Sequence, residues 1–127
     1  MNVENVKRLP YAVWKVKDIE YKLKLGTAEI VSLESYFKTS LLNLVEGMPA
    51  LSTMLKITHA ALSKYNHGIT LKDVYSMFDD YCDEGGSQIS FMTDVFVKIY
   101  QASGFFSSAQ ENMMNEKIQE AQEQLEQ

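Results

Sequence analysis

The chain has 127 residues, of which 46% are hydrophobic and 23% are charged, and it carries a net charge of −5 and a single cysteine. These values are typical of one globular domain around one core, and they exclude wholesale disorder and an internal disulfide. No stretch approaches the roughly 18 apolar residues of a membrane span, and the first residues lack the apolar core of a signal peptide. We therefore expect a protein of a reducing cytosol.

The charge is unevenly distributed along the chain. Residues 1–24 contain six Lys or Arg and three Asp or Glu, a net charge of +3, whereas residues 25–127 contain six and fourteen, a net charge of −8. An acidic body disfavours nucleic acid as a partner, because affinity for a phosphate backbone depends on Lys and Arg. It suits solubility or a basic protein partner.

A β-hairpin is predicted after an N-terminal extension of residues 1–10. Residues 11–16 are rich in β-branched and aromatic side chains, and residues 19–25 alternate apolar and polar residues, which indicates two strands. The turn at Lys17 and Asp18 lacks the Asn-Gly or Asp-Gly signal, so its type stays open. Because a lone hairpin is marginal in water, its apolar face should pack on helices, with Ile19, Tyr21, Leu23 and Leu25.

Five helices are predicted next, from cap residues and from apolar residues that recur with a period near 3.6. Thr70, followed by Asp73, resembles a capping box at the start of the fourth helix. The resulting fold is α+β and mainly α, a hairpin packed on about five helices within a compact domain of residues 11–106. The helices are expected over about 28–38, from Ser40 to Gly47, over about 51–65, from Thr70 to Gly85 and from Ser87 to Gly104.

The composition changes after the compact domain. Residues 107–127 contain five Gln, five Glu and one Lys, and few large apolar side chains. Strong helix formers dominate, but the segment cannot build a core of its own. We expect a polar amphipathic tail that is helical or partly disordered.

Candidate partner-binding residues lie around the start of this tail and along it. Adjacent aromatic residues in a helix cannot both face the core, and methionine is an adaptable contact residue. Trp14 is either a core anchor or an exposed contact, and the general burial of tryptophan favours the core. The candidates for partner contact are Phe105, Phe106, Met113, Met114, Ile118 and Leu125.

No pattern in the chain predicts catalysis, a cofactor or a metal ion. His59 and His67 are separated by about 12 Å of expected helix, too far to share a metal ion. The acidic run of residues 79–86 fits an EF-hand loop in neither of two registers, because the bidentate glutamate at the twelfth position is missing. The carboxylates around Cys82 should raise the pKa of its thiol, which favours an inert cysteine. We predict a non-catalytic protein.

Three segments resemble the tail assembly chaperones encoded by long-tailed phages and prophages of Gram-positive bacteria. They are YKLKLGTAEIVSLE at residues 21–34, LKITHAALSKYNHGITLKDVYSMFDDY at residues 55–81, and SGFF at residues 103–106, with Gly85-Gly86 between the last two. In that family a β segment leads into a helix containing a Leu-Glu pair. The resemblance covers roughly residues 20–106. The sequence departs from the family pattern at residues 35–37, where a lysine-rich stretch ending in Leu-Gly would be expected.

The resemblance implies a partner and a location. Such a chaperone binds the tape measure protein and keeps it soluble in the host cytoplasm while the tail tube assembles, and it is absent from the mature virion. A longer form made by ribosomal frameshifting recruits tail tube protein. Whether the protein also forms a homo-oligomer stays open. The alternative is a small acidic cytosolic adaptor or regulatory protein, phage-encoded, that binds a host or phage factor.

Overall fold

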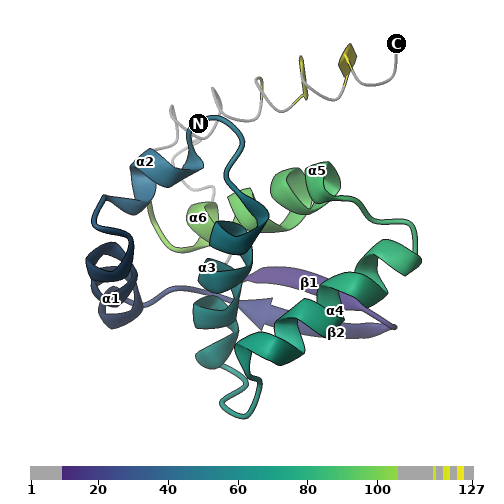
Figure 1. Ribbon diagram of the computed structural model, residues 1–127, viewed down its shortest axis with the longest axis horizontal. Helices are drawn as coiled ribbons and strands as arrows, with labels where there is room; N and C mark the ends of the chain where they lie inside the picture. Colours follow the sequence, from purple (N-terminus) through teal and green to yellow (C-terminus); the bar gives the residue numbers. More distant parts are fainter. Residues whose placement is uncertain (1–9, 106–115, 117–118, 121–122, 125–127) are drawn as a thin grey trace, which may run out of the picture.

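The computed structural model describes residues 10–105 together with residues 116, 119–120 and 123–124 (Figure 1). It confirms the predicted α+β, mainly α fold, because one antiparallel hairpin precedes a set of helices. The strands are β1 (Ala12–Val16) and β2 (Ile19–Leu23). The helices are α1 (Thr27–Phe37), α2 (Leu41–Val45), α3 (Leu51–Ser63), α4 (Leu71–Asp83), α5 (Gln88–Phe91), the π-helical η2 (Met92–Phe96) and α6 (Val97–Ala102).

The hairpin turns at the two predicted residues, and its backbone shows the turn type. Lys17 and Asp18 have φ values of 51° and 65°, and two successive residues with positive φ form the type I′ turn that matches strand twist. The turn is also fixed to the end of α4. The Lys17 N–H donates to Glu84 Oε1 at 3.0 Å, and Lys17 Nζ lies 3.4 Å from Asp80 Oδ2. Contacts to α4 therefore support a turn whose sequence is not optimal.

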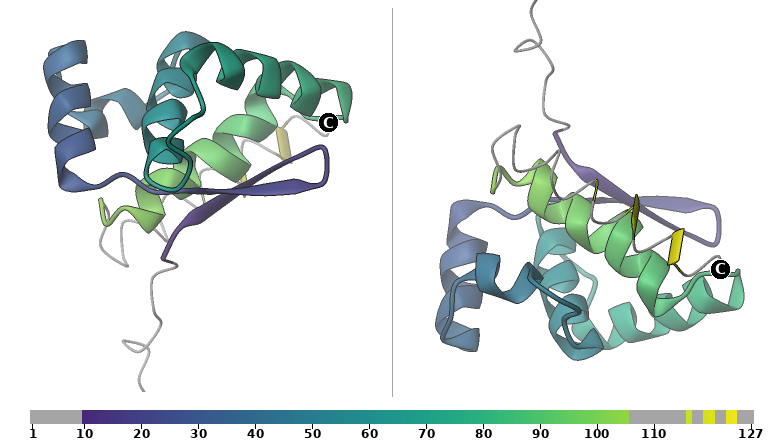
Figure 2. Two further views of the ribbon diagram at one scale, coloured as in Figure 1. Left: turned by 90° about the horizontal axis from the view of Figure 1, so that it is seen from below. Right: turned by 90° about the horizontal axis from the view of Figure 1, so that it is seen from above.

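One face of the hairpin lies on the helices, which gather on that side of it (Figure 2). Side chains alternate along a strand, and Ala12, Trp14 and Val16 of β1 are all buried on this face. Leu23 and Leu25 are buried as predicted. Tyr21 is half-buried. The prediction was wrong for Ile19, which is 53% exposed at the turn end of the hairpin, although its partner Val16 is buried.

Trp14 is the centre of an aromatic cluster, which confirms the predicted burial. Its side chain is 1% exposed. Its ring meets the rings of Phe91 and Tyr81 edge to face, with centroids 5.1 Å and 6.0 Å away. Edge-to-face contact is favourable for aromatic rings. Trp14 therefore joins the hairpin to α4 and α5.

Cap residues begin three of the helices where the sequence placed them. Ser40 and Ser87 accept hydrogen bonds from the N–H groups three residues later, at 3.3 Å and 3.0 Å. Thr70 Oγ1 accepts from the Asp73 N–H at 3.1 Å, and Asp73 Oδ2 accepts from the Thr70 N–H at 2.9 Å, which completes a capping box. These bonds satisfy backbone donors that a helix start leaves free.

The last predicted helix contains a π-helical segment that the sequence pattern did not indicate. Residues 88–102 run as α5, η2 and α6 without a break. Phe91 and Phe96 are both fully buried, and they are five residues apart, which is the hydrogen-bond spacing of a π-helix. The wider turn brings Val95, Phe96 and Val97 into the core together.

Candidate functional site

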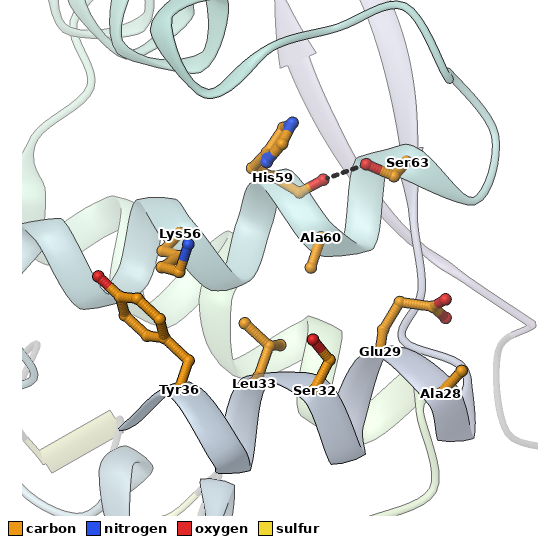
Figure 3. Close-up of a pocket in the computed structure, with 9 residues that line it drawn as sticks. All are labelled: Ala28, Glu29, Ser32, Leu33, Tyr36, Lys56, His59, Ala60 and Ser63. Atoms are coloured by element: carbon orange, nitrogen blue, oxygen red, sulfur yellow. Dashed lines mark hydrogen bonds between the residues drawn. The ribbon is translucent and has the colours of Figure 1, made fainter. Parts of the chain in front are cut away.

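A depression on the folded body lies between α1 and α3 (Figure 3). It has a volume of about 380 Å³. Ser32 and Leu33 of α1 point across it toward Ala60 of α3, while the His59 ring points away from α1 (Figure 3). We call it the α1–α3 groove, and its lining residues are Ala28, Glu29, Ser32, Leu33, Tyr36, Lys56, His59, Ala60 and Ser63.

A tyrosine and a lysine form one end of this groove. Lys56 Nζ lies 4.1 Å from the centroid of the Tyr36 ring, a cation–π contact between α3 and α1. Tyr36 is nevertheless 64% exposed, so most of the ring surface faces solvent. Small side chains line the rest of the groove, where Ala28, Ser32 and Ala60 leave room between the helices.

Glu29, His59 and Ser63 of the groove each have a hydrogen-bond partner in the backbone, and no two of them form a catalytic pair. His59 Nε2 lies 2.8 Å from the Ile69 carbonyl oxygen, to which it donates. Ser63 Oγ donates to the His59 carbonyl oxygen at 3.0 Å, so its hydroxyl bonds to backbone and not to the imidazole. Glu29 Oε1 accepts from the Gly26 N–H at 2.8 Å and serves as a helix cap. The groove therefore offers shape and an exposed aromatic ring, which suit contact with another polypeptide.

A second, smaller depression lies on the other side of α3, against α4. Its volume is about 270 Å³, and Tyr75 on its rim is 47% exposed. The two depressions share α3, so apolar surface is offered along both flanks of this helix. The second depression is lined by Leu51, Ser52, Leu55, Tyr75, Phe78 and Asp79.

One of the predicted partner-binding residues is described by the structure. Phe105 is half-buried, and its ring centroid lies 4.9 Å from that of the buried Tyr100, so it packs on the core at the end of α6. The other candidates lie outside the described residues, and their role stays a prediction. They are Phe106, Met113, Met114, Ile118 and Leu125.

Cys82 lies near the end of α4 and is half-buried. Desolvation raises the pKa of its thiol, and the neighbouring carboxylates of Asp79 and Asp83 raise it further. The direction agrees with the prediction from sequence, although burial is the larger cause. Among the described residues, no group of three or more His, Cys, Asp or Glu side chains is arranged to hold a metal ion.

The comparison with protein families identifies the group to which the chain belongs. A model described as a family of unknown function, DUF6096, matches residues 7–126. The chain belongs to the DUF6096 family. No curated protein and no solved structure matches it. The DUF6096 match includes the Gln/Glu-rich segment beyond residue 106, so the family extends over the folded body and the tail.

Within residues 10–105 and the described positions of the tail, no helix has the length and apolarity needed to cross a membrane.

Of the residues that line the α1–α3 groove, the sequence pattern drew attention only to His59, as a metal ligand that its spacing from His67 excluded. Ala28 and Ser32 are four residues apart on α1, a spacing that places two small side chains on one helix face. That spacing could have indicated a close approach by another helix. Tyr36 lies within residues 35–37, where the sequence departs from the chaperone pattern. The way α1 lies against α3 gives the groove its shape, and no local pattern in the sequence encodes it.

Proposed function

We propose that this DUF6096 protein is a tail assembly chaperone that binds a tape measure protein and keeps it soluble, without catalysis, while a phage tail tube assembles. The observation that carries the proposal is the resemblance of residues 20–106 to such chaperones. The α1–α3 groove gives it a physical basis, because the groove is open, lined by small residues and bordered by the exposed Tyr36.

The groove suggests how a helical client binds. An amphipathic helix lays its apolar face into a groove between two helices and uses residues on successive turns as anchors. Ala28, Ser32 and Ala60 let the client backbone approach, and Leu33 forms the buried floor. Tyr36 and Lys56 at the end of the groove contact the apolar and polar edges of the client helix. Covering Tyr36 removes the exposed surface of its ring from water, together with apolar surface of the client.

The charge of the chain supports the same role. A net charge of −5 keeps a complex with an apolar client in solution, because like charges on the surfaces of separate complexes repel each other. The proposal places the protein in the host cytoplasm and outside the mature virion. It also includes a longer frameshifted form, through which the tail tube protein is recruited.

Co-expression tests the proposal directly. The partner to use is the very long, coiled-coil-rich protein encoded by a neighbouring gene, with an affinity tag on the chaperone. We expect the long protein to stay in the supernatant and to copurify at modest salt. A long protein that precipitates equally with and without the chaperone would contradict the proposal. Copurification of a host polymerase or nuclease in its place would favour the adaptor function.

Truncation after Phe106 tests the role of the tail in the same assay. We expect a chain ending at this residue to keep its helical circular dichroism spectrum and to bind the client more weakly. An unchanged affinity would remove Met113, Met114, Ile118 and Leu125 from the binding mechanism while leaving the groove in place.

A further inference from the structure

The hairpin presents a basic and aromatic face to solvent, opposite the face that packs on the helices. Residues alternate between the two faces, and Val13 pairs with Lys22 while Lys15 pairs with Glu20. These four side chains are all exposed. We define the hairpin face as Tyr11, Val13, Lys15, Glu20, Lys22 and Lys24.

Two lysines of the hairpin face have no anionic partner among the residues that the structure describes. Lys22 Nζ lies 4.8 Å from the centroid of the Tyr11 ring and 5.9 Å from that of Tyr65 at the end of α3, so two aromatic rings position its charge. Within the part of the chain that the structure describes, no carboxylate lies within ion-pair distance of Lys22 or Lys24. Lys15 differs, because its Nζ lies 3.9 Å from Asp18 Oδ1.

The described residues of the tail include three exposed glutamates. Glu116, Glu120 and Glu123 are helical and exposed, and spacings of four and three residues place them on one helix face. Gln119 Nε2 donates to Glu123 Oε2 at 3.5 Å. Among the described residues, none of these three glutamates has a lysine or arginine within ion-pair distance. We define them as the tail acidic face.

The spacing of the charges allows two simultaneous contacts. Lys22 and Lys24 are two residues apart along the hairpin, which separates their Cα atoms by about 6.6 Å. A spacing of four residues, as between Glu116 and Glu120, corresponds to about 6 Å along the axis of an α-helix. Two ammonium groups on one surface can therefore meet two carboxylates on the other.

We infer that the hairpin face of one copy binds the tail acidic face of a second copy. Lys22 and the three glutamates are exposed within a single copy and Lys24 is half-buried, so each surface can meet its complement on another copy. Two hairpin faces repel each other, as do two tail acidic faces, and the contact is therefore head to tail. The inference rests on charge and geometry and is independent of the proposed chaperone function.

Sedimentation velocity on the full chain tests this inference. We expect self-association at about 20 mM salt and dissociation at about 300 mM, because salt shortens the screening length to below about 10 Å. The double variant K22E/K24E should raise the dissociation constant about tenfold or more. The control K72E/K98E makes the same charge change at two exposed lysines outside the hairpin face and should associate like the wild type, apart from a small effect of net charge.

A charge-swap pair separates this contact from a general effect of charge. K22E/K24E alone and E116K/E120K/E123K alone should each be monomeric at low salt, because like charges then face each other. An equimolar mixture should associate, since each hairpin face now meets an opposite charge. Circular dichroism checks that every variant folds. A monomeric wild-type chain at low salt, unchanged association of K22E/K24E, or a mixture that stays monomeric would overturn the inference.

Discussion

Tyr100 connects the three helices that meet at one end of the molecule. It is fully buried, and its hydroxyl donates to the Leu41 carbonyl oxygen at 2.7 Å. The Leu41 N–H in turn donates to Glu34 Oε2 at 2.9 Å, so α1, α2 and α6 share one hydrogen-bond network. Burial, and to a smaller degree the Glu34 carboxylate, raises the pKa of Tyr100 above its ordinary value. The hydroxyl therefore stays protonated and available as a donor.

Removing this hydroxyl should destabilise the fold. Tyr100→Phe keeps the ring and its contacts but leaves the buried Leu41 carbonyl without that donor, at a cost of about 1–2 kcal/mol in the free energy of unfolding. Urea denaturation monitored by circular dichroism measures the loss. Tyr36→Phe is the matched control, because Tyr36 is 64% exposed. The urea midpoint of this variant should equal that of the wild type. Equal midpoints for both variants would mean that the network adds nothing to stability.

The raised pKa of the Cys82 thiol allows a second test at the scale of a single residue. Its pKa is raised, so a smaller fraction of thiolate is present at a given pH than for a free thiol, and alkylation should be slow. Asp83→Asn removes one of the two carboxylates that raise the pKa and should speed alkylation by iodoacetamide at pH 8. The increase should be partial, since desolvation is the larger cause. Glu46→Gln, an exposed position on another part of the surface, should leave the rate unchanged, and a rate unaffected by Asp83→Asn would contradict this assignment.

At the scale of single elements, helix starts could be predicted from local side-chain chemistry. Features that depend on packing between elements could not. Ser40, Thr70 and Ser87 carry their signal in the side chain itself, so the starts of α2, α4 and α5 followed from sequence. The π-helical turn of η2 has no such marker. The exposure of Ile19 also escaped prediction, because the alternation of β2 does not tell where the cover of helices ends.

The hairpin turn provides a test at this scale. Lys17 and Asp18 both adopt positive φ, which costs energy for residues with a Cβ atom. Replacing them with Asn-Gly, the preferred type I′ pair, should raise the free energy of unfolding by about 1 kcal/mol. The N–H at position 17 can still donate to Glu84, although the contact of the Lys17 ammonium with Asp80 is lost. Thermal unfolding measures the change, and a lower melting temperature would show that the ion pair outweighs the backbone strain.

At the scale of the whole molecule, the fold class followed from composition and period, whereas the candidate site did not. Hydrophobic periodicity reports which face of a helix is buried, but the α1–α3 groove depends on how two helices lie against each other. The residues chosen from sequence as partner contacts were mainly in the tail. Of these, the structure describes only Phe105, which packs on Tyr100.

The central claim is that the α1–α3 groove binds helical segments of a tape measure protein, and filling the groove tests it most directly. Ser32→Trp places a large side chain in the groove from an exposed position, and Ser35→Trp places the same side chain at an exposed position of α1 outside the groove lining. The measurement is the fraction of the tape measure protein that stays in the supernatant on co-expression with each variant. We expect the Ser35→Trp variant to match the wild type and Ser32→Trp to lose most of the soluble client. Equal solubility with both variants would contradict the groove as the binding site, and precipitation even with the wild type would contradict the chaperone function itself.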